Sequence, residues 1–182
     1  MNTAPTKRNP PAFAVATLLA LAVPLCVTLA MTTAYADEKD DRARIGAMLD
    51  DFHAAAAEAD RERYLGHFTE QGVFMGTDDW ERWPLPEFTE YVAGRFENGG
   101  GWEYHPESRH IAFDADTDTA WFDEIAVSPR WGRFRGTGVV IRTDAGWKLA
   151  HYSLTALVPN ELFRDVSDLT RPGFEARSEK SN

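Results

Sequence analysis

The sequence predicts an α+β domain in which three N-terminal helices pack on a curved antiparallel sheet. Apolar residues recur at helical spacing after residue 37, and from Trp102 onward they alternate at every second position. Only short turns separate the later segments, so neighbouring strands are expected to run antiparallel, because a parallel return needs a crossover of about a dozen residues. A lone sheet of about four to five strands cannot bury its apolar side, and helices must therefore cover one face.

The first 36 residues have the plan of a secretory signal peptide. Lys7 and Arg8 precede an apolar run from Phe13 to Ala30, and the small-x-small sequence Ala34-Tyr35-Ala36 follows. A membrane anchor is the alternative, but Pro24 interrupts the apolar run and the small-residue site comes directly after it. We expect cleavage after Ala36 and export to the periplasm or the cell exterior, with no membrane segment in the mature chain.

The composition excludes several classes of protein. The chain has 182 residues, a formal charge of −10 and one cysteine, Cys26, which lies inside the predicted signal peptide. A single cysteine rules out a disulfide scaffold and a multi-thiolate metal site. The acidic balance argues against nucleic-acid binding, since that affinity comes mainly from Lys and Arg that neutralise phosphates. The length fits one domain, predicted over residues 37–160, followed by a charged tail over 161–182 that frays beyond Pro172.

The mature chain begins with helices. From Glu38 to Ala59, apolar residues at steps of three and four place one stripe along a helix: Ile45, Leu49, Phe52, Ala56 and Ala59. Asp60 is positioned to cap a second, short helix over residues 61–65. A short strand over residues 73–75 and a loop over 77–84 follow.

A third helix and then a series of strands complete the domain. The helix is indicated by Leu85, Phe88, Val92 and Phe96, and it stops at Gly99-Gly100-Gly101. The strands are predicted near Trp102–His105 with His110–Asp114, Thr119–Ser128, Gly132–Arg142 and Trp147–Val158.

Several stretches of the mature chain carry a family resemblance. They are Val73-Phe74-Met75-Gly76-Thr77-Asp78, Thr119-Ala120-Trp121-Phe122-Asp123-Glu124, Arg135-Gly136-Thr137-Gly138-Val139 and the run from Gly146 to Leu154. Together with the order of helices and strands, they resemble the nuclear transport factor 2-like superfamily, in particular its SnoaL-like bacterial branch. The resemblance implies a cone whose open end holds a small apolar ligand between helices and sheet. Members include isomerases, cyclases, dehydratases and epoxide hydrolases as well as binding and dimerisation modules, so the reaction stays open.

The strand alternation indicates which side chains share the interior of such a cone. On the last strand His151 and Ser153 point away from Lys148, and because Lys148 is expected outside, His151 is expected inside. On an earlier strand Trp121 and Asp123 share one face, but both faces hold apolar residues, so the pattern does not settle which is inward. If Trp121 is inward, these four residues share the concave face.

Asp123 and His151 form the catalytic hypothesis. A carboxylate near a histidine in an apolar cleft can have its pKa moved towards neutrality and serve as a general base. We predict Asp123 as the base and His151 as its partner. The alternative is structural: His151 hydrogen-bonds within a satisfied core, and Asp123 pairs with Arg133 or Arg135.

The loop over residues 77–83 is the second candidate, because it would lie at the mouth of the cone. It carries three carboxylates, one arginine and two tryptophans within seven residues, and aromatic side chains at a pocket rim are used in ligand recognition. The alternative is a plain turn in which Thr77 and Asp78 bond to the backbone. The predicted ligand-binding residues are Tyr64, Phe74, Asp78, Trp80, Trp83, Phe88, Trp121 and Ser153.

No cofactor and no metal are expected, since the five histidines lack zinc spacing and no phosphate-binding glycine motif lies at a strand-to-helix turn. Two functions stay open. The first is an exported SnoaL-like domain that binds a small, largely apolar molecule, with cofactor-free acid–base chemistry of the isomerase, cyclase or dehydratase type as an option. The second is a non-catalytic dimerisation or protein-interaction module. A homodimer through the sheet is expected if the convex face exposes Phe122, Phe134, Tyr152 and Leu154.

Overall fold

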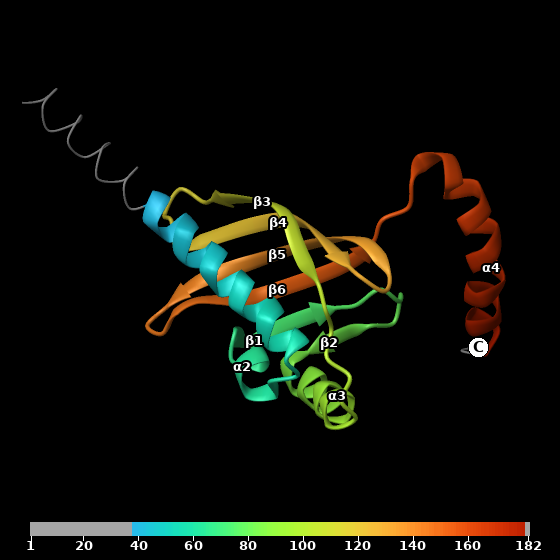
Figure 1. Ribbon diagram of the computed structural model, residues 1–182, viewed down its shortest axis with the longest axis horizontal. Coiled ribbons are helices and arrows are strands. Elements are labelled where there is room, and N and C mark those ends of the chain that lie inside the picture. Colours follow the sequence, from blue (N-terminus) through green and yellow to red (C-terminus); the bar gives the residue numbers. More distant parts are fainter. Residues whose placement is uncertain (1–37, 181–182) are drawn as a thin grey trace, which may run out of the picture. The chain divides into compact units, whose positions relative to one another are not determined.

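The computed structural model describes residues 38–180. The predicted signal peptide, its cleavage site after Ala36 and Cys26 lie outside the described residues. Within residues 38–180, helices and one curved, open six-stranded sheet form the predicted α+β fold (Figure 1). None of the helices in this part of the chain is long and apolar enough to cross a membrane.

The sheet is a meander extended at one edge. Its strands are β1 (Phe68–Met75), β2 (Arg82–Pro84), β3 (His105–Phe113), β4 (Thr119–Ser128), β5 (Gly132–Thr143) and β6 (Gly146–Ala156), in the spatial order β2-β1-β6-β5-β4-β3. Strands β3 to β6 pair antiparallel in sequence order, as the short turns between them predict. β1 pairs in parallel with β6 and antiparallel with β2.

Three parts of the sheet differ from the prediction. β1 begins at Phe68 rather than at Val73, and β3 is one strand, with a register shift between Pro106 and Ser108, rather than two segments. β2 lies in the segment predicted to be a loop. A three-residue edge strand that ends in proline shows no alternation, so the sequence pattern does not reveal it.

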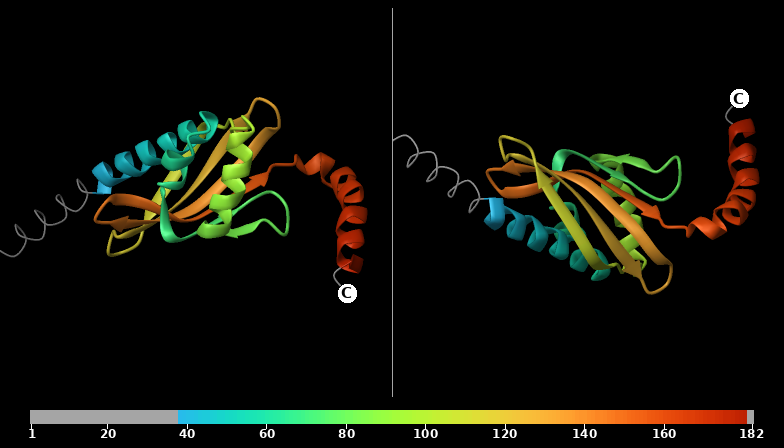
Figure 2. Two further views of the ribbon diagram at one scale, coloured as in Figure 1. Left: turned by 90° about the horizontal axis from the view of Figure 1, so that it is seen from below. Right: turned by 90° about the horizontal axis from the view of Figure 1, so that it is seen from above.

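Three helices cover the inner face of the sheet. The first is helical over residues 38–57, and its predicted stripe is buried at Ile45, Leu49, Phe52 and Ala56. The prediction that this helix extends to Ala59 is wrong, because Ala59 has a left-handed backbone conformation, with φ of 56°, in the turn after the helix. Asp60 caps α2 (Arg61–Leu65) as predicted, because its side chain accepts a hydrogen bond of 3.2 Å from the backbone N–H of Arg63. α3 (Leu85–Glu97) buries Phe88, Val92 and Phe96. Figure 2 shows α3 and the helix that ends at residue 57 on one side of the sheet, with the strands uncovered on the other.

Aromatic rings fill the space between helices and sheet. Phe52 stacks on Tyr64 with ring centroids 4.7 Å apart, and Phe74 stacks on Phe88 at 4.3 Å. Full burial of such a side chain stabilises a fold by about 1.5–3 kcal/mol. This aromatic layer holds the helices on the sheet and forms most of the wall of the pocket described below.

The C-terminal segment forms α4 (Phe163–Lys180) after a short 3-10 turn, η1 (Asn160–Leu162). The prediction that this tail frays beyond Pro172 is wrong, because the helix continues through the proline. Proline removes one helical hydrogen bond, but Glu, Ala and Arg residues after it favour helix. Arg171 also pairs with Asp168 across one turn at 2.9 Å.

Candidate functional site

Strand β4 shows which face of the sheet is inward. Phe122, Glu124 and Ala126 are buried, whereas Trp121 and Asp123 on the alternate side are exposed. The helices therefore pack on the face that carries Glu124. The sequence pattern left this choice open because both faces contain apolar residues.

A one-residue bulge in β6 changes the direction of its later side chains. Val139 pairs with His151 and Val140 pairs with Leu149, so Ala150 has no partner on β5. An extra residue shifts the two-residue alternation of a strand by one position. Leu149 therefore faces inward before the bulge, and His151 faces outward after it.

The predicted catalytic pair lies on the outer face of the sheet. Trp121, Asp123, His151 and Ser153 share one face as expected, but the expectation that this face is concave is wrong. The reason is the bulge in β6 together with the inward orientation of Glu124 in β4. Nε2 of His151 lies 3.1 Å from Sδ of Met75 on the neighbouring strand. Neither Asp123 nor His151 lines the pocket between helices and sheet.

The residues expected on an exposed convex face are in the core. Phe122, Phe134, Tyr152 and Leu154 are each at most 6% exposed. They lie on the inner face under the helices, because the bulge places Tyr152 and Leu154 there. They are therefore not available for a contact through the sheet.

A pocket of about 110 Å³ lies between the helices and the inner face. Its wall is mainly aromatic and includes the predicted ligand-binding residues Tyr64, Phe74 and Trp83. Polar atoms come from His53, Thr77, Glu81, Tyr91, Tyr104 and Tyr152. An apolar pocket with a few polar groups is the usual form of a small-molecule site.

The other predicted ligand-binding residues lie outside this wall. Phe88 is fully buried behind Phe74, and Trp80 is 57% exposed. Asp78 pairs with Arg177 of α4, with 2.7 Å between Oδ1 and Nη1. Trp121 and Ser153 lie on the outer face, as described above.

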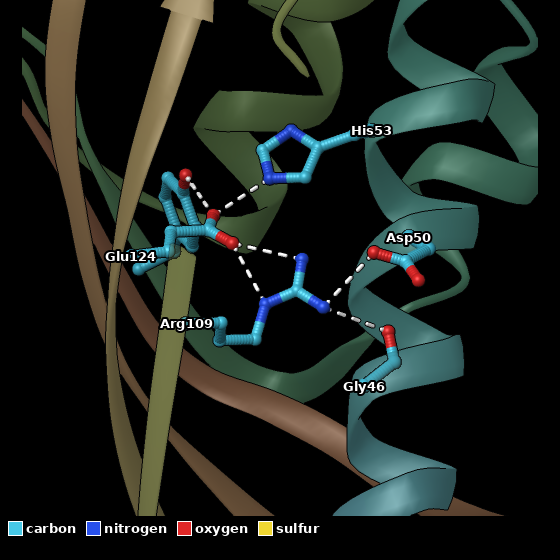
Figure 3. Close-up of polar contacts among 6 residues, drawn as sticks. Gly46, Asp50, His53, Arg109 and Glu124 are labelled. Carbon is cyan, nitrogen blue, oxygen red and sulfur yellow. Dashed lines mark hydrogen bonds and ion pairs between the residues drawn. The ribbon is translucent and has the colours of Figure 1, made fainter. Parts of the chain in front are cut away.

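Glu124 is the centre of a buried polar cluster beside the pocket (Figure 3). Its Oε1 accepts a hydrogen bond of 3.0 Å from the hydroxyl of Tyr152 and lies 2.6 Å from Nε2 of His53. Its Oε2 accepts a hydrogen bond of 2.9 Å from Nε of Arg109, whose Nη2 is 2.8 Å away. Both carboxylate oxygens are thus satisfied, as a fully buried carboxyl requires.

Arg109 connects this cluster to the first helix. Its Nη1 donates to Oδ1 of Asp50 at 2.9 Å and to the backbone carbonyl of Gly46 at 3.0 Å. Figure 3 shows the guanidinium between Glu124 and the helix. The arginine therefore fixes the strand carboxylate and the helix that carries His53 relative to each other.

Glu124 is ionised. Burial by itself raises the pKa of this carboxyl, but the hydrogen bonds and charges of His53 and Arg109 outweigh burial and hold the pKa below its ordinary value. An ionised carboxylate only accepts hydrogen bonds, so Nε2 of His53 must carry the proton. Nδ1 of His53 points away from Glu124 and has no hydrogen-bond partner among residues 38–180 (Figure 3). In its neutral form, His53 with the proton on Nε2 keeps an unshared electron pair on Nδ1.

Tyr152 stays protonated beside this carboxylate. Burial, and next the charge and hydrogen bond of Glu124, raise the pKa of Tyr152 well above its ordinary value. Gly136 leaves the space for this contact, since a Cβ at residue 136 would lie 2.4 Å from the Tyr152 hydroxyl and 2.9 Å from Oε1 of Glu124.

A second carboxylate lies at the wall of the pocket nearest the loop over residues 77–81. Oε2 of Glu81 accepts a hydrogen bond of 3.0 Å from the backbone N–H of Asp78. Burial, and next the charge of Glu81, raise the pKa of Tyr91 and of Tyr104. The loop is a hydrogen-bonded turn in which the Asp78 side chain accepts from the backbone N–H of Asp79 at 2.9 Å, as the turn alternative predicted for Asp78. Through Glu81 and Thr77 the loop also lines the pocket.

Comparison with known families identifies the domain. Residues 45–159 match the family model described as the SnoaL-like domain. The chain belongs to the SnoaL-like family. The match includes most of the first helix, the whole sheet and every residue of the pocket wall. No curated protein matches this SnoaL-like chain.

Solved structures with the same fold extend this result. A nuclear transport factor 2-like protein of unknown function from Pseudomonas putida has 13% identity and a TM-score of 0.55, and the alignment covers 65% of this chain and 88% of that chain. A proposed dehydratase of the nuclear transport factor 2-like family from Streptomyces avermitilis has 21% identity and a TM-score of 0.56, and the alignment covers 67% of this chain and 99% of that chain. A proposed aromatic ring hydroxylase from Novosphingobium aromaticivorans has 21% identity and a TM-score of 0.57, and the alignment covers 66% of this chain and 91% of that chain. At these identities the likeness establishes the cone-shaped fold.

Sequence reasoning missed His53, Arg109 and Glu124 in this SnoaL-like domain. Two signals point to them in retrospect. His53 follows Phe52 in the buried stripe of the first helix, and Glu124 alternates with Phe122 on β4. An acidic residue at a core position requires a donor, which is the reason to search for a histidine or arginine on the facing elements.

Metal binding has no obvious ligand set in the described part of the SnoaL-like domain. Among residues 38–180, no group of three or more His, Cys, Asp or Glu side chains is arranged to hold a metal ion. The oxygens of Glu124 are occupied by its own partners. His53 is the titratable side chain that joins this buried cluster to the pocket wall.

Proposed function

We propose that this protein is an exported SnoaL-like domain that binds a small, largely apolar molecule and acts on it by cofactor-free acid–base chemistry. One observation carries the proposal: His53 lines an aromatic pocket and is oriented through Nε2 by a buried, ionised carboxylate. A histidine held in this way is the usual arrangement of a general base. Asp123 and His151 have no part in it.

In the proposed reaction, Nδ1 of His53 removes a proton from the bound molecule. The imidazolium that forms is stabilised by Glu124 through Nε2–H, while Arg109 keeps the carboxylate in place. His53 then returns the proton to another carbon of the ligand in an isomerisation, or to a departing hydroxyl in a dehydration. Both outcomes conserve protons and need no cofactor.

The wall of the pocket supports a flat, apolar ligand. Phe52, Tyr64, Phe74 and Trp102 present rings, and Tyr104 presents a phenol that can bind a carbonyl or hydroxyl oxygen. One of the solved structures with this fold is a proposed dehydratase, and a dehydration can proceed with acid and base groups alone. That class agrees with the groups present in this pocket.

A proton-abstraction probe tests the proposal without knowledge of the ligand. 5-Nitrobenzisoxazole is flat and apolar, and it opens to a coloured phenolate when a base removes its ring proton. The mature protein is expected to accelerate this opening over buffer, and His53→Gln to reduce the acceleration by about a hundredfold. His151→Gln, on the outer face, is the matched control and should retain the rate. Equal rates for the wild type and His53→Gln would overturn the assignment.

A second candidate function, a homodimer through the sheet, is favoured by the outer face. Trp121 is 50% exposed there, next to the half-buried Val139 and Ile141. Asp123 and Arg135 lie on the same face, and neither has an ion-pair partner among residues 38–180. A two-fold axis would bring Asp123 of one copy to Arg135 of the other, because such an interface is self-complementary.

Analytical ultracentrifugation tests this interface. The mature protein is expected to sediment as a dimer, and Trp121→Glu as a monomer, while Trp80→Glu on the pocket side serves as control. Asp123→Arg should weaken the dimer, and adding Arg135→Asp should restore it. A monomeric wild type at high concentration, or a dimer unaffected by Trp121→Glu, would disprove the interface.

The proposed export is tested by processing. Expression of the full chain in a bacterial host with a periplasm should give a periplasmic protein whose mass corresponds to cleavage after Ala36. Replacing Ala34 and Ala36 with bulky residues should block this cleavage. An unprocessed protein that stays in the cytoplasm would contradict the proposal.

A further inference from the structure

A second pocket of about 180 Å³ borders the first one. It lies between the C-terminal end of α3, the segment over residues 101–104 and the turn between β4 and β5, and it shares Trp102 and Tyr104 with the first pocket. This second pocket has no part in the proposed proton transfer. Its wall combines two arginines with two tryptophans.

The arginines are stacked on tryptophans. The guanidinium carbon of Arg95 lies 5.8 Å from the ring centroid of Trp102, and that of Arg130 lies 4.6 Å from the ring centroid of Trp131. Neither Arg95 nor Arg130 has an ion-pair partner among residues 38–180, although the chain carries 29 acidic residues. Stacked guanidinium groups keep their edge N–H donors free, and these fit a carboxylate in a bidentate fashion.

The acidic side chain in this wall is engaged elsewhere. Oε1 of Glu103 lies 2.9 Å from Nε2 of His105, so the glutamate is held by the histidine rather than by an arginine. Glu103 and His105 are both exposed, so their pair is a surface contact, and the two arginines outnumber the one carboxylate in this wall.

The backbone around the pocket is tightly positioned. The N–H of Trp102 donates to the carbonyl of Ala56 at 2.9 Å, which ties this wall to the first helix. Glycine at position 100 makes room for Arg95, since a Cβ there would lie 2.9 Å from its Nε. The side chain of Arg95 occupies this space beside Trp102.

We propose that this second pocket binds a small aromatic carboxylate. The carboxylate lies against Arg95 and Arg130, and the aromatic ring lies on Trp131, which is 66% exposed and offers a flat face. The site differs from the His53 pocket in its charge, and it does not depend on proton transfer. Because Trp102 and Tyr104 belong to both walls, a ligand here touches the same rings as a ligand in the first pocket.

Isothermal titration of the mature protein with 2-naphthoate, and with neutral 2-naphthamide as its uncharged analogue, tests the site. The carboxylate is expected to bind at least about tenfold more tightly than the amide. Arg95→Gln and Arg130→Gln should each remove most of this preference. Arg61→Gln is the matched control, because Arg61 is an exposed arginine of α2 that lies outside the pocket and has no ion-pair partner among the described residues.

Two further variants separate this site from the first pocket. Trp131→Ala should weaken naphthoate binding, whereas His53→Gln should leave it unchanged even if the proposed proton transfer fails. Equal affinities for naphthoate and naphthamide would overturn the proposal. A preference for naphthoate over naphthamide that persists in the double variant Arg95→Gln with Arg130→Gln would overturn it as well.

Discussion

His53 and Glu124 are 71 positions apart in the chain, yet Nε2 of His53 lies 2.6 Å from Oε1 of Glu124 inside the core. The contact joins the first helix to the middle of the sheet, and Arg109 closes it from the other side. A contact of this kind couples the orientation of a pocket histidine to the stability of the fold. Both can be measured on the same variants.

Glu124 is expected to make the stability of the protein pH-dependent in acid. Its folded pKa lies below the ordinary value of 4.5, so the unfolded chain binds more protons. The stabilisation by the Glu124 carboxylate is complete above pH 4.5 and is lost as the pH falls through the pKa of Glu124 in the folded protein. Glu124→Gln should lower the free energy of unfolding by about 3 kcal/mol near neutral pH, because the part-buried Arg109 loses its buried carboxylate and keeps only the exposed Asp50 as an ion-pair partner.

Urea unfolding at a series of pH values measures this effect. The difference between the wild type and Glu124→Gln should shrink as the solution becomes more acidic. A difference that stays constant over the whole range would show that the carboxylate charge does not contribute.

Gly136→Ala is expected to destabilise the protein. The new Cβ would meet the Tyr152 hydroxyl at 2.4 Å, so the bond from Tyr152 to Glu124 has to break or shift. Overpacking of this kind costs about 1–3 kcal/mol. Gly94→Ala in α3 is the matched control: a Cβ there meets nothing within 4 Å, and the change should stabilise by about 0.5–1 kcal/mol. Thermal unfolding of both variants measures the two effects. Equal shifts of the unfolding midpoint would contradict the close contact between residue 136 and the Tyr152 hydroxyl.

Tyr64 and Tyr152 are expected to resist ionisation. Burial raises the pKa of both phenols well above 10, and for Tyr152 the charge of Glu124 adds to the effect. Ultraviolet absorbance in an alkaline titration should therefore show that these two tyrosines ionise only when the protein unfolds. The denatured chain provides the reference in which all tyrosines titrate. The variants Tyr64→Phe and Tyr152→Phe test this assignment. A change in the reversible part of the titration curve in either variant would contradict it, because the replaced tyrosine would then ionise in the folded protein.

Arg177 is expected to control the ionisation of Asp78. Its side-chain hydrogen bond outweighs partial desolvation and lowers the pKa of Asp78 from 3.8 to about 2. Arg177→Gln should raise the Asp78 pKa towards its ordinary value, as followed by NMR of the side-chain carboxyl carbon. Arg171→Gln is a suitable control, since Arg171 pairs with Asp168 within α4. An unchanged Asp78 pKa in Arg177→Gln would mean that α4 does not contact this loop in solution.

Local patterns predicted most of the fold. The stripe from Ile45 to Ala56, the cap at Asp60 and the bounds of β4 all follow from residues close in sequence, because helical spacing, capping and alternation are short-range effects. β2 was not predicted, because a three-residue edge strand is too short to show an alternation of apolar and polar residues. The continuation of α4 through Pro172 was not predicted, because proline is normally a helix breaker.

The candidate site was predicted less well. Tyr64, Phe74 and Trp83, which were predicted to bind the ligand, line the pocket, since aromatic residues on the covered side of the early elements pack between helices and sheet. Their part in ligand binding stays a prediction. Asp123 and His151 were grouped correctly on one face, but that face is the outer one.

By itself, the sequence determined the order of the elements, the acidic and thiol-poor composition and the family to which the chain belongs. Only the tertiary structure decided which face of the sheet the helices cover and which polar groups meet there. The physical reason is the two-residue period of a strand: one unpaired residue, Ala150, reverses every side chain that follows it. No local pattern marks such a bulge, and no local pattern brings His53 to Glu124 across 71 positions, because both depend on how distant segments pack.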